Sequence, residues 1–357
     1  MLFPYPADAL ASNWLNSEVI NVLIEGMDAI DAGGMPAAWP GCVSAERRLA
    51  LEPRRGLKRH LEDFWASYEQ LSGGEKKTIR DSIARQTDLP GVYSDNNPCP
   101  VSDDFPAQVR GITKTLFDYL FNLLGEIKDG DKCIRDIQYA TVYYGGCRLC
   151  PFCGLNYFRA PEAPRHALDH LMDKQRYPFS AADLRNLPPT CHECNSHFKG
   201  TSDILHRENG TRRRCSDPYS GPVFEVSLRA SKFVEVDGRT LPQWKVDFIG
   251  GQSEQAETWD AVYKVKTRYC RDVLDKDFLS WLGHFSRWYT RTFGKGTTAI
   301  EVAGQLPNYI DGVIQDGFAD RAFLKAEAFR FVHSSCNDPE GGDDIREWLR
   351  NFVEYST

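Results

Sequence analysis

Residues 150–200, CPFCGLNYFRAPEAPRHALDHLMDKQRYPFSAADLRNLPPTCHECNSHFKG, form the stretch that decides the fold of this 357-residue chain. It contains two C-x-x-C pairs, Cys150 with Cys153 and Cys191 with Cys194. Four thiolates at this spacing are typical of a tetrahedral zinc site that leaves no open position. The sequence therefore predicts a structural Zn²⁺ that holds the fold together and takes no part in a reaction.

A further cysteine, Cys147, precedes Cys150 by three positions and could replace it as a ligand. That choice would leave Cys153 and Gly154 unexplained. In a zinc knuckle, the metal-binding turn formed by a C-x-x-C pair, the residue after the second cysteine often needs the backbone freedom of glycine. We therefore interpret Cys147 as a free thiol. The chain has 11 cysteines, an odd number, which favours metal binding in a reducing compartment over a disulfide framework.

Length and composition indicate a folded protein with more than one packed unit, because 357 residues exceed the usual size of one hydrophobic core. The start of the chain lacks the pattern of a signal peptide, and no apolar run is long enough to cross a membrane. We therefore expect a cytoplasmic protein with no membrane partner. The net charge of −7 restricts any site for a polyanion to a local patch, and positive charge is concentrated around the cysteines.

The pattern of apolar residues divides the chain into three regions. Residues 1–140 have mostly helical periodicity, and residues 141–216 contain the cysteine pairs and short strand-like pieces. Residues 217–357 begin with alternation typical of a small antiparallel sheet, with a turn at Asp237-Gly238, and continue with helical periodicity. This organisation predicts an α+β fold.

Three other features resemble functional motifs but favour structural interpretations. Residues 71–75, LSGGE, resemble the signature peptide of ABC-type ATPases, yet no phosphate-binding loop accompanies them, and Ser72 with Glu75 predicts a helix-capping box. His206 and Glu208 resemble part of a zinc deaminase site, but they follow the C-x-x-C pair instead of preceding it. The basic residues of 47–59 are interpreted as a solvated helix face, and a face that contacts phosphates is the alternative.

The residues between and after the cysteine pairs are consistent with phosphodiester hydrolysis, which needs a deprotonated water and a cation that holds the phosphate. Adjacent residues at the end of a strand point to opposite faces, so Asp169 can bind a metal ion while His170 faces the attacking water as a general base. Asn195, directly after the second pair, would supply the second metal ligand. Oxygen ligands favour Mg²⁺, although Mn²⁺ also fits such a site.

The order of Leu168-Asp169-His170, Asn186, Asn195 and the two cysteine pairs resembles the HNH endonuclease family, in the bacterial form that carries a CxxC…CxxC zinc site. The resemblance covers roughly 50 residues. It implies a ββα-metal core embedded between the helical N-terminal region and the sheet-plus-helix C-terminal region. It also implies DNA cleavage that leaves 5′-phosphate and 3′-hydroxyl ends.

The family pattern implies a role for two further residues. Asn186 corresponds to the central asparagine, whose side chain braces the loop that carries the histidine. Lys199 stands where many members have a second histidine. Because a protonated lysine cannot bind a cation, we expect Lys199 to contact phosphate instead.

A positive surface for DNA is predicted from five further basic residues. They are Lys174, Arg176, Arg212, Arg213 and Arg214. A solvated loop is the alternative interpretation of the three consecutive arginines.

Residues beyond the motif also resemble this HNH type. Residues 217–219, followed by a small sheet and Arg268-Tyr269, are similar to an extension found in bacterial nucleases of anti-phage defence systems such as Septu. Those nucleases work beside an ATPase, so the resemblance implies an ATPase partner. The alternative function is a catalytically inactive, zinc-stabilised subunit that binds nucleic acid or protein.

Overall fold

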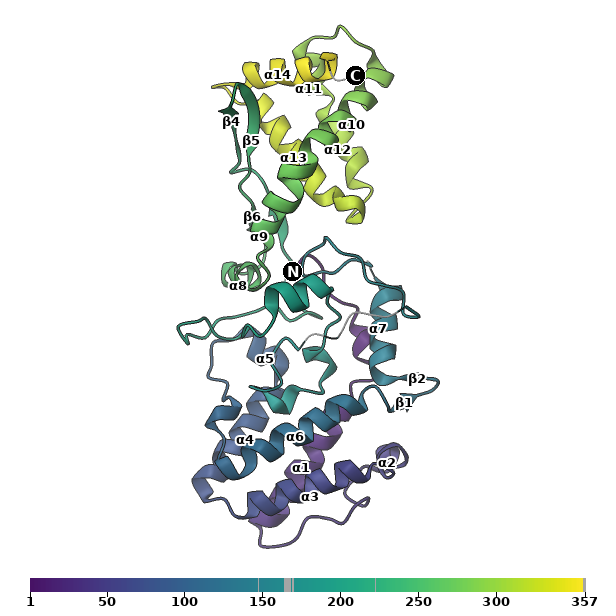
Figure 1. The fold of residues 1–357 in the computed structure, drawn as a ribbon, viewed down its shortest axis with the longest axis vertical. Coiled ribbons are helices and arrows are strands. Elements are labelled where there is room, and N and C mark those ends of the chain that lie inside the picture. The colour runs from purple at the N-terminus through teal and green to yellow at the C-terminus, as the bar shows by residue number, and fades with distance from the viewer. Residues whose placement is uncertain (147, 164–167, 169, 222, 356–357) are drawn as a thin grey trace.

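The computed structural model describes residues 1–146, 148–163, 168, 170–221 and 223–355. The molecule is elongated, with the N-terminal helices at one end and the C-terminal helices at the other (Figure 1). The cysteine-containing segment lies between these two ends. None of the helices in the described part of the chain has both the length and the apolar character that a membrane span requires.

The N-terminal end is a bundle of helices, as the periodicity predicted. The helices are α1 (Leu15–Asp31), α2 (Ala45–Leu51), α3 (Arg55–Glu69), α4 (Gly73–Thr87), α5 (Leu89–Ser94) and α6 (Ala107–Leu123). Val19, Leu23 and Met27 of α1 are buried, since residues three and four apart share one face of a helix. Helix α4 begins with the predicted capping box, in which the Glu75 N–H bonds the Ser72 side chain and the Glu75 carboxylate accepts from the Ser72 N–H.

The middle of the chain has little regular structure. It begins with the short strands β1 (Lys128–Asp129) and β2 (Lys132–Cys133) and helix α7 (Ile134–Gly145). Isolated antiparallel bridges then join Leu149 to Tyr157, Leu168 to Pro189, and His206 to Arg212. A π-helix covers Glu193–Lys199 and begins between the two cysteines of the second pair.

The C-terminal region begins with four short strands, β3 (Glu225–Ser227), β4 (Lys232–Val236), β5 (Arg239–Gln243) and β6 (Asp247–Ile249). The predicted turn is present, with positive φ angles of 50° at Asp237 and 72° at Gly238, which match the twist of a tight hairpin. The strands form two separate antiparallel pairs, β3 with β6 and β4 with β5, where the sequence predicted one small sheet.

Helices form the rest of the C-terminal region. They are α8 (Ser253–Tyr263), α9 (Val265–Arg268), α10 (Asp275–Phe293), α11 (Ala299–Gly304), α12 (Leu306–Ile314), α13 (Ala322–Cys336) and α14 (Gly342–Tyr355), with a π-helical turn at Tyr269–Leu274 between α9 and α10. Helical periodicity predicted most of this region correctly. The whole protein is mostly helical, with small two-stranded antiparallel sheets, and is broadly α+β.

Two hydrophobic cores meet in the cysteine-containing segment. Phe179, Leu184 and Leu187 belong to the core of the N-terminal helices. The four paired cysteines belong to the other core, which extends into the C-terminal helices. The segment between 148 and 216 therefore depends on both ends of the molecule for its packing, and the predicted domain boundaries at residues 140 and 216 stay predictions.

Candidate zinc centre and nuclease site

The four paired cysteines form a buried cluster. The Sγ atoms of Cys150, Cys153, Cys191 and Cys194 all lie within 4.8 Å of one another, and those of Cys153 and Cys191 are 3.8 Å apart. A zinc–sulfur bond of about 2.3 Å places two ligands of a regular tetrahedron about 3.8 Å apart. The cluster therefore fits a structural Zn²⁺ in both size and ligand type, and within the described residues it is the one group of three or more His, Cys, Asp or Glu suited to a metal.

Hydrogen bonds from both knuckles point at the sulfur atoms. The backbone N–H of Leu155 donates to Cys153 Sγ at 3.4 Å, and that of Cys194 donates to Cys191 Sγ at 3.5 Å. Gly154 has a positive φ of 63°, and a Cβ there would lie 2.4 Å from Leu2 Cδ1. Glycine is therefore favoured at position 154, because a residue with a Cβ is strained at this positive φ.

Residues of the C-terminal region hold the first knuckle in place. The indole Nε1 of Trp259 donates to the Phe152 carbonyl at 2.8 Å, and the Tyr269 hydroxyl donates to the Cys153 carbonyl at 2.7 Å. These bonds satisfy backbone carbonyls that a tight knuckle leaves without partners.

His170 is half-buried, and its position is fixed by two contacts. Its Nε2 lies 3.0 Å from the Ala181 carbonyl oxygen, and its ring centroid lies 4.6 Å from that of Phe121 on α6. Because a carbonyl can only accept, the proton of the neutral ring belongs on Nε2, and Nδ1 keeps its lone pair. The arrangement suits a histidine that accepts a proton at Nδ1.

The surroundings keep this imidazole neutral. Burial and, to a smaller extent, the positive charges of Lys174 and Lys199 lower the pKa of His170 to about 4, while the hydrogen bond to Ala181 and the charge of Asp173 oppose the shift. The two lysines therefore lie close enough to His170 for their charges to act on it.

Asn186 is fully buried, and its side chain ties together both ends of the loop that follows His170. Its Oδ1 accepts from the Met172 N–H at 2.8 Å, while its Nδ2 donates to the Met172 carbonyl at 3.0 Å and to the Ser180 carbonyl at 3.2 Å. The Tyr93 hydroxyl, from α5, donates to the same Oδ1 at 3.3 Å. The backbone is paired here too, since the Leu171 N–H donates to the Asn186 carbonyl at 3.0 Å.

The predicted ligands of the catalytic cation are only partly covered by the structure. Asp169 lies outside the described residues, as does Cys147. Asn195 is half-buried in the π-helical turn, where its N–H donates to the Cys191 carbonyl at 3.0 Å. With one of the two predicted ligands described, the magnesium site stays a prediction.

Lys199 closes the same turn and is buried, with 3% of its surface exposed. Its Nζ donates to the Gly200 carbonyl at 3.4 Å. Contact between this ammonium group and a phosphate would therefore require the turn to open.

Lys174 and Arg176 lie on the loop that Asn186 braces. The Lys174 Nζ is 2.7 Å from Asp118 on α6 and lies over the Phe121 ring. Arg176 is about half-exposed and pairs with Asp203 at 3.5 Å. The side chains of Lys174 and Arg176 are 32% and 47% exposed, so both cations also reach solvent.

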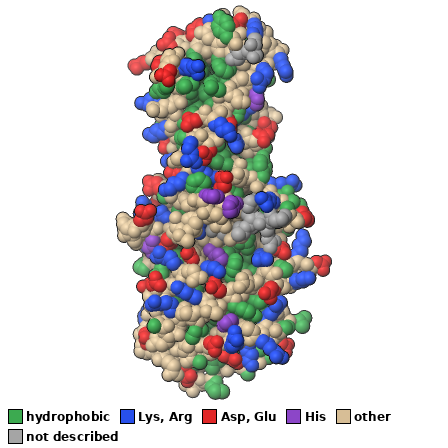
Figure 2. All heavy atoms as spheres, viewed as in Figure 1, with side chains coloured by type: hydrophobic (Ala, Val, Ile, Leu, Met, Phe, Trp, Pro, Cys, Tyr) green, Lys and Arg blue, Asp and Glu red, His purple; other side chains and the backbone are tan. Residues whose placement is uncertain are grey.

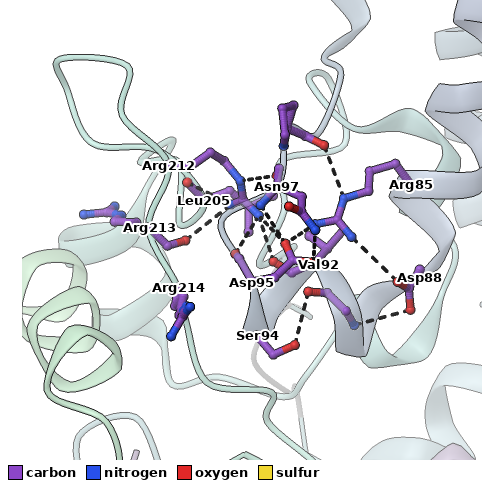
Figure 3. Close-up of polar contacts among 12 residues, drawn as sticks. Arg85, Asp88, Val92, Ser94, Asp95, Asn97, Leu205, Arg212, Arg213 and Arg214 are labelled. Carbon is purple, nitrogen blue, oxygen red and sulfur yellow. Dashed lines mark hydrogen bonds and ion pairs between the residues drawn. The ribbon is translucent and has the colours of Figure 1, made fainter.

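Arg212 points into the protein (Figure 3). Its guanidinium donates to the carbonyls of Val92 and Leu205 at 2.9 Å, of Asn97 at 2.9 Å, and of Asp95 at 3.1 Å. It thereby joins the segment that follows α5 to residues 205–213. In this structure the side chain stabilises the fold, and phosphate contact would require these bonds to break.

The two arginines that follow differ from each other. Arg213 is 8% exposed and donates to the carbonyls of Ile204 and Asp203. Arg214 is more exposed and contacts Gln252 and Glu254 at the start of α8. Of the three consecutive arginines, Arg214 is the one whose contacts are polar side chains near the surface.

Basic and acidic side chains are interspersed over the face drawn in Figure 2, and histidines gather near its middle. Among the described side chains on this face, the basic ones form no long stripe.

Sequence reasoning assigned no role to Phe121, Tyr93 or Arg268, which contact the site residues. Phe121 and Tyr93 come from helices whose sequence patterns signal only burial. Arg268 lies in a segment quoted above for its resemblance to a nuclease extension, and its guanidinium donates to Cys194 Sγ at 3.3 Å. Nothing local in the sequence links these residues to the cysteine pairs or to His170.

Comparison with known proteins gives no match for this chain among protein-family models, curated proteins or solved structures.

Proposed function

We propose that the protein is a metal-dependent endonuclease of the HNH type that hydrolyses DNA phosphodiester bonds. The observation that carries the proposal is the setting of His170, a neutral imidazole whose Nε2–H is bonded to the Ala181 carbonyl and whose Nδ1 is left as the acceptor. A histidine held in this tautomer is suited to take a proton from an attacking water.

The residues around His170 support the same proposal. The Leu168–Pro189 bridge and the Leu171–Asn186 backbone bond form a short antiparallel pair, and a helical turn at 193–199 follows it. This order of two paired segments and a helix is the one that the HNH resemblance implies. Asn186 bonds both ends of the loop between the paired segments, which supports a fixed orientation of the imidazole.

Asp169 and Asn195 would hold the catalytic cation, for which we propose Mg²⁺. Such an ion, when bound, neutralises charge that develops on the phosphate. Two positively charged side chains, Lys174 and Lys199, lie near the site, since their charges lower the pKa of His170. We propose that Lys174, together with Arg176 and Arg214, contacts the DNA backbone.

The zinc cluster is equally compatible with one alternative function, a catalytically inactive subunit that binds nucleic acid or protein. A closed site of four cysteines is structural in either case. The orientation of His170 supports the nuclease over the inactive subunit, because a general base needs a neutral histidine that keeps an acceptor nitrogen. The family resemblance also leads us to propose an ATPase partner that controls cleavage.

The test is cleavage of supercoiled plasmid by the purified, zinc-containing protein. We expect nicked and linear products with Mg²⁺ or Mn²⁺ and none without added divalent cation, with ends that a ligase can rejoin. Because the proposed partner can be required for activity, the assay is repeated with linear, nicked and single-stranded substrates at high enzyme concentration. Tight DNA binding without cleavage under any of these conditions would favour the inactive subunit.

A further inference from the structure

A buried arginine lies against the cysteine cluster. Arg268, the last residue of α9, is 1% exposed. Its Nη1 donates to Cys194 Sγ at 3.3 Å and to the Tyr263 carbonyl at 3.4 Å. The guanidinium carbon lies 4.2 Å from the centre of the Phe198 ring, and Nη2 lies 3.6 Å from Glu193 Oε2. Arg268 thus contacts the second knuckle and the π-helical turn that follows it.

The charges of the cluster explain why an arginine is tolerated there. Four thiolates around one Zn²⁺ carry a net charge of −2, and burying a charge without a partner is costly. A buried guanidinium has the same difficulty, and the Arg268 Nη2 has no hydrogen-bond partner in the described part of the chain. Placed beside the cluster, the guanidinium offsets half of this negative charge.

We propose that Arg268 is a positioning residue for the zinc centre, which retains the metal by neutralising and hydrogen-bonding the thiolates. A hydrogen bond from a cation lowers the electron-donor strength of a thiolate and makes it less reactive toward acids and oxidants. Partners of this kind around a metal typically change its affinity about 10- to 100-fold. The proposal concerns the zinc centre alone and stands whether or not the chain cleaves DNA.

A simpler role would be to dock the C-terminal region onto the knuckles. Trp259 offers a matched control, because it also joins the C-terminal region to the cluster but does so through a neutral hydrogen bond to the Phe152 carbonyl. Trp259→Phe removes this bond and keeps most of the packing. If Arg268 only docks the C-terminal region, Arg268→Met and Trp259→Phe should lose zinc at the same rate and share one charge-transfer band. If its charge acts on the thiolates, the rate and the band should differ between the two variants.

The experiment uses the full chain as wild type, Arg268→Met, Arg268→Lys and Trp259→Phe. Zinc loss to an excess of a chromogenic chelator is followed at temperatures where each protein is folded, alongside a melting curve. The zinc is then replaced by Co²⁺, whose sulfur-to-metal charge-transfer band reports directly on the thiolates. We expect Arg268→Met to lose zinc at least about tenfold faster than a Trp259→Phe protein of equal melting temperature, with Arg268→Lys in between.

We also expect the charge-transfer band to move to longer wavelength in Arg268→Met, because the thiolates become stronger donors, and to stay unchanged in Trp259→Phe. If Arg268→Met does not fold, the charge-transfer band of Arg268→Lys is the test. Lysine keeps the positive charge but lacks the planar guanidinium that donates to Cys194, so we expect a smaller shift to longer wavelength. An unchanged band in the folded Arg268 variants, or zinc loss equal to that of the tryptophan variant, would overturn the proposal.

Discussion

The Nε2–H of His170 donates a hydrogen bond of 3.0 Å to the carbonyl oxygen of Ala181. This bond fixes both the orientation and the tautomer of the ring, because a carbonyl cannot donate. Phe121 supports the ring from α6, at 4.6 Å between ring centroids. A helix of the N-terminal region thus helps to position the residue that we propose as the general base.

The depressed pKa of His170 predicts a contribution to stability that depends on pH. The folded protein holds this pKa at about 4, against an ordinary value of 6.5. Between these values the unfolded chain binds more protons at His170 than the folded protein does, so stability falls as the pH falls from 6.5 toward 4. We expect the melting temperature of the wild type to drop more between about pH 7 and about pH 5 than that of His170→Ala. Equal drops would show that the ring is not held in a neutral form.

Removal of one zinc ligand should abolish folding. We expect about one zinc per chain in the purified protein, and insoluble or protease-sensitive protein for Cys191→Ser, because binding of a structural zinc is part of the folding free energy. Cys42→Ser is the control, since Cys42 lies outside the cluster. Elemental analysis and limited proteolysis measure both effects. A soluble, compact Cys191→Ser protein would refute the structural role of the metal.

Asn186→Ala should destabilise the loop that carries His170. It leaves the Met172 N–H and the carbonyls of Met172 and Ser180 without their side-chain partner, at about 1–3 kcal/mol for each buried group that stays unpaired. We expect a melting temperature several degrees lower and reduced cleavage, with zinc content retained. Asn308→Ala, on an exposed helix surface, is the control. A normal melting curve would mean that other contacts hold the loop.

Arg212 and Arg214 should differ in how much each contributes to thermal stability. Arg212→Ala removes the donor for carbonyls of both segments that Arg212 joins, so we expect a clear loss of thermal stability. Arg214→Ala loses only contacts near the surface and should melt within about 1 kcal/mol of the wild type. Similar melting curves for the two variants would show that the inward bonds of Arg212 contribute little.

DNA binding should depend on the cations that can reach solvent. Replacing Lys174, Arg176 and Arg214 together by alanine should reduce the slope of log affinity against log salt by up to about 2.7, because each phosphate that a cation no longer neutralises lowers the slope by about 0.9. Affinity should fall equally for unrelated sequences. If the slope stays unchanged while the protein still melts normally, DNA binds elsewhere, and residues 54–59 of the N-terminal region are the next candidates.

The sequence predicted the features that short motifs of closely spaced residues encode. The zinc cluster, the Ser72 capping box and the Asp237-Gly238 hairpin each follow from local spacing, and the structure contains the four-cysteine cluster, the capping box and the hairpin turn. Contacts between distant residues could not be predicted in this way. Arg212 resembled a surface cation because its carbonyl partner at Val92 is 120 positions away, and Arg268 is 74 positions from Cys194. Only the folded chain brings these groups together.

The central claim is that His170 is the general base of a DNA-cleaving site. The most direct measurement compares the rate of plasmid cleavage by wild type and His170→Ala in Mg²⁺, with DNA affinity and zinc content measured on the same preparations. We predict a rate at least about 10²-fold lower for His170→Ala, with affinity and zinc unchanged, because a general base acts in the transition state. Cleavage by His170→Ala at the wild-type rate would contradict the claim.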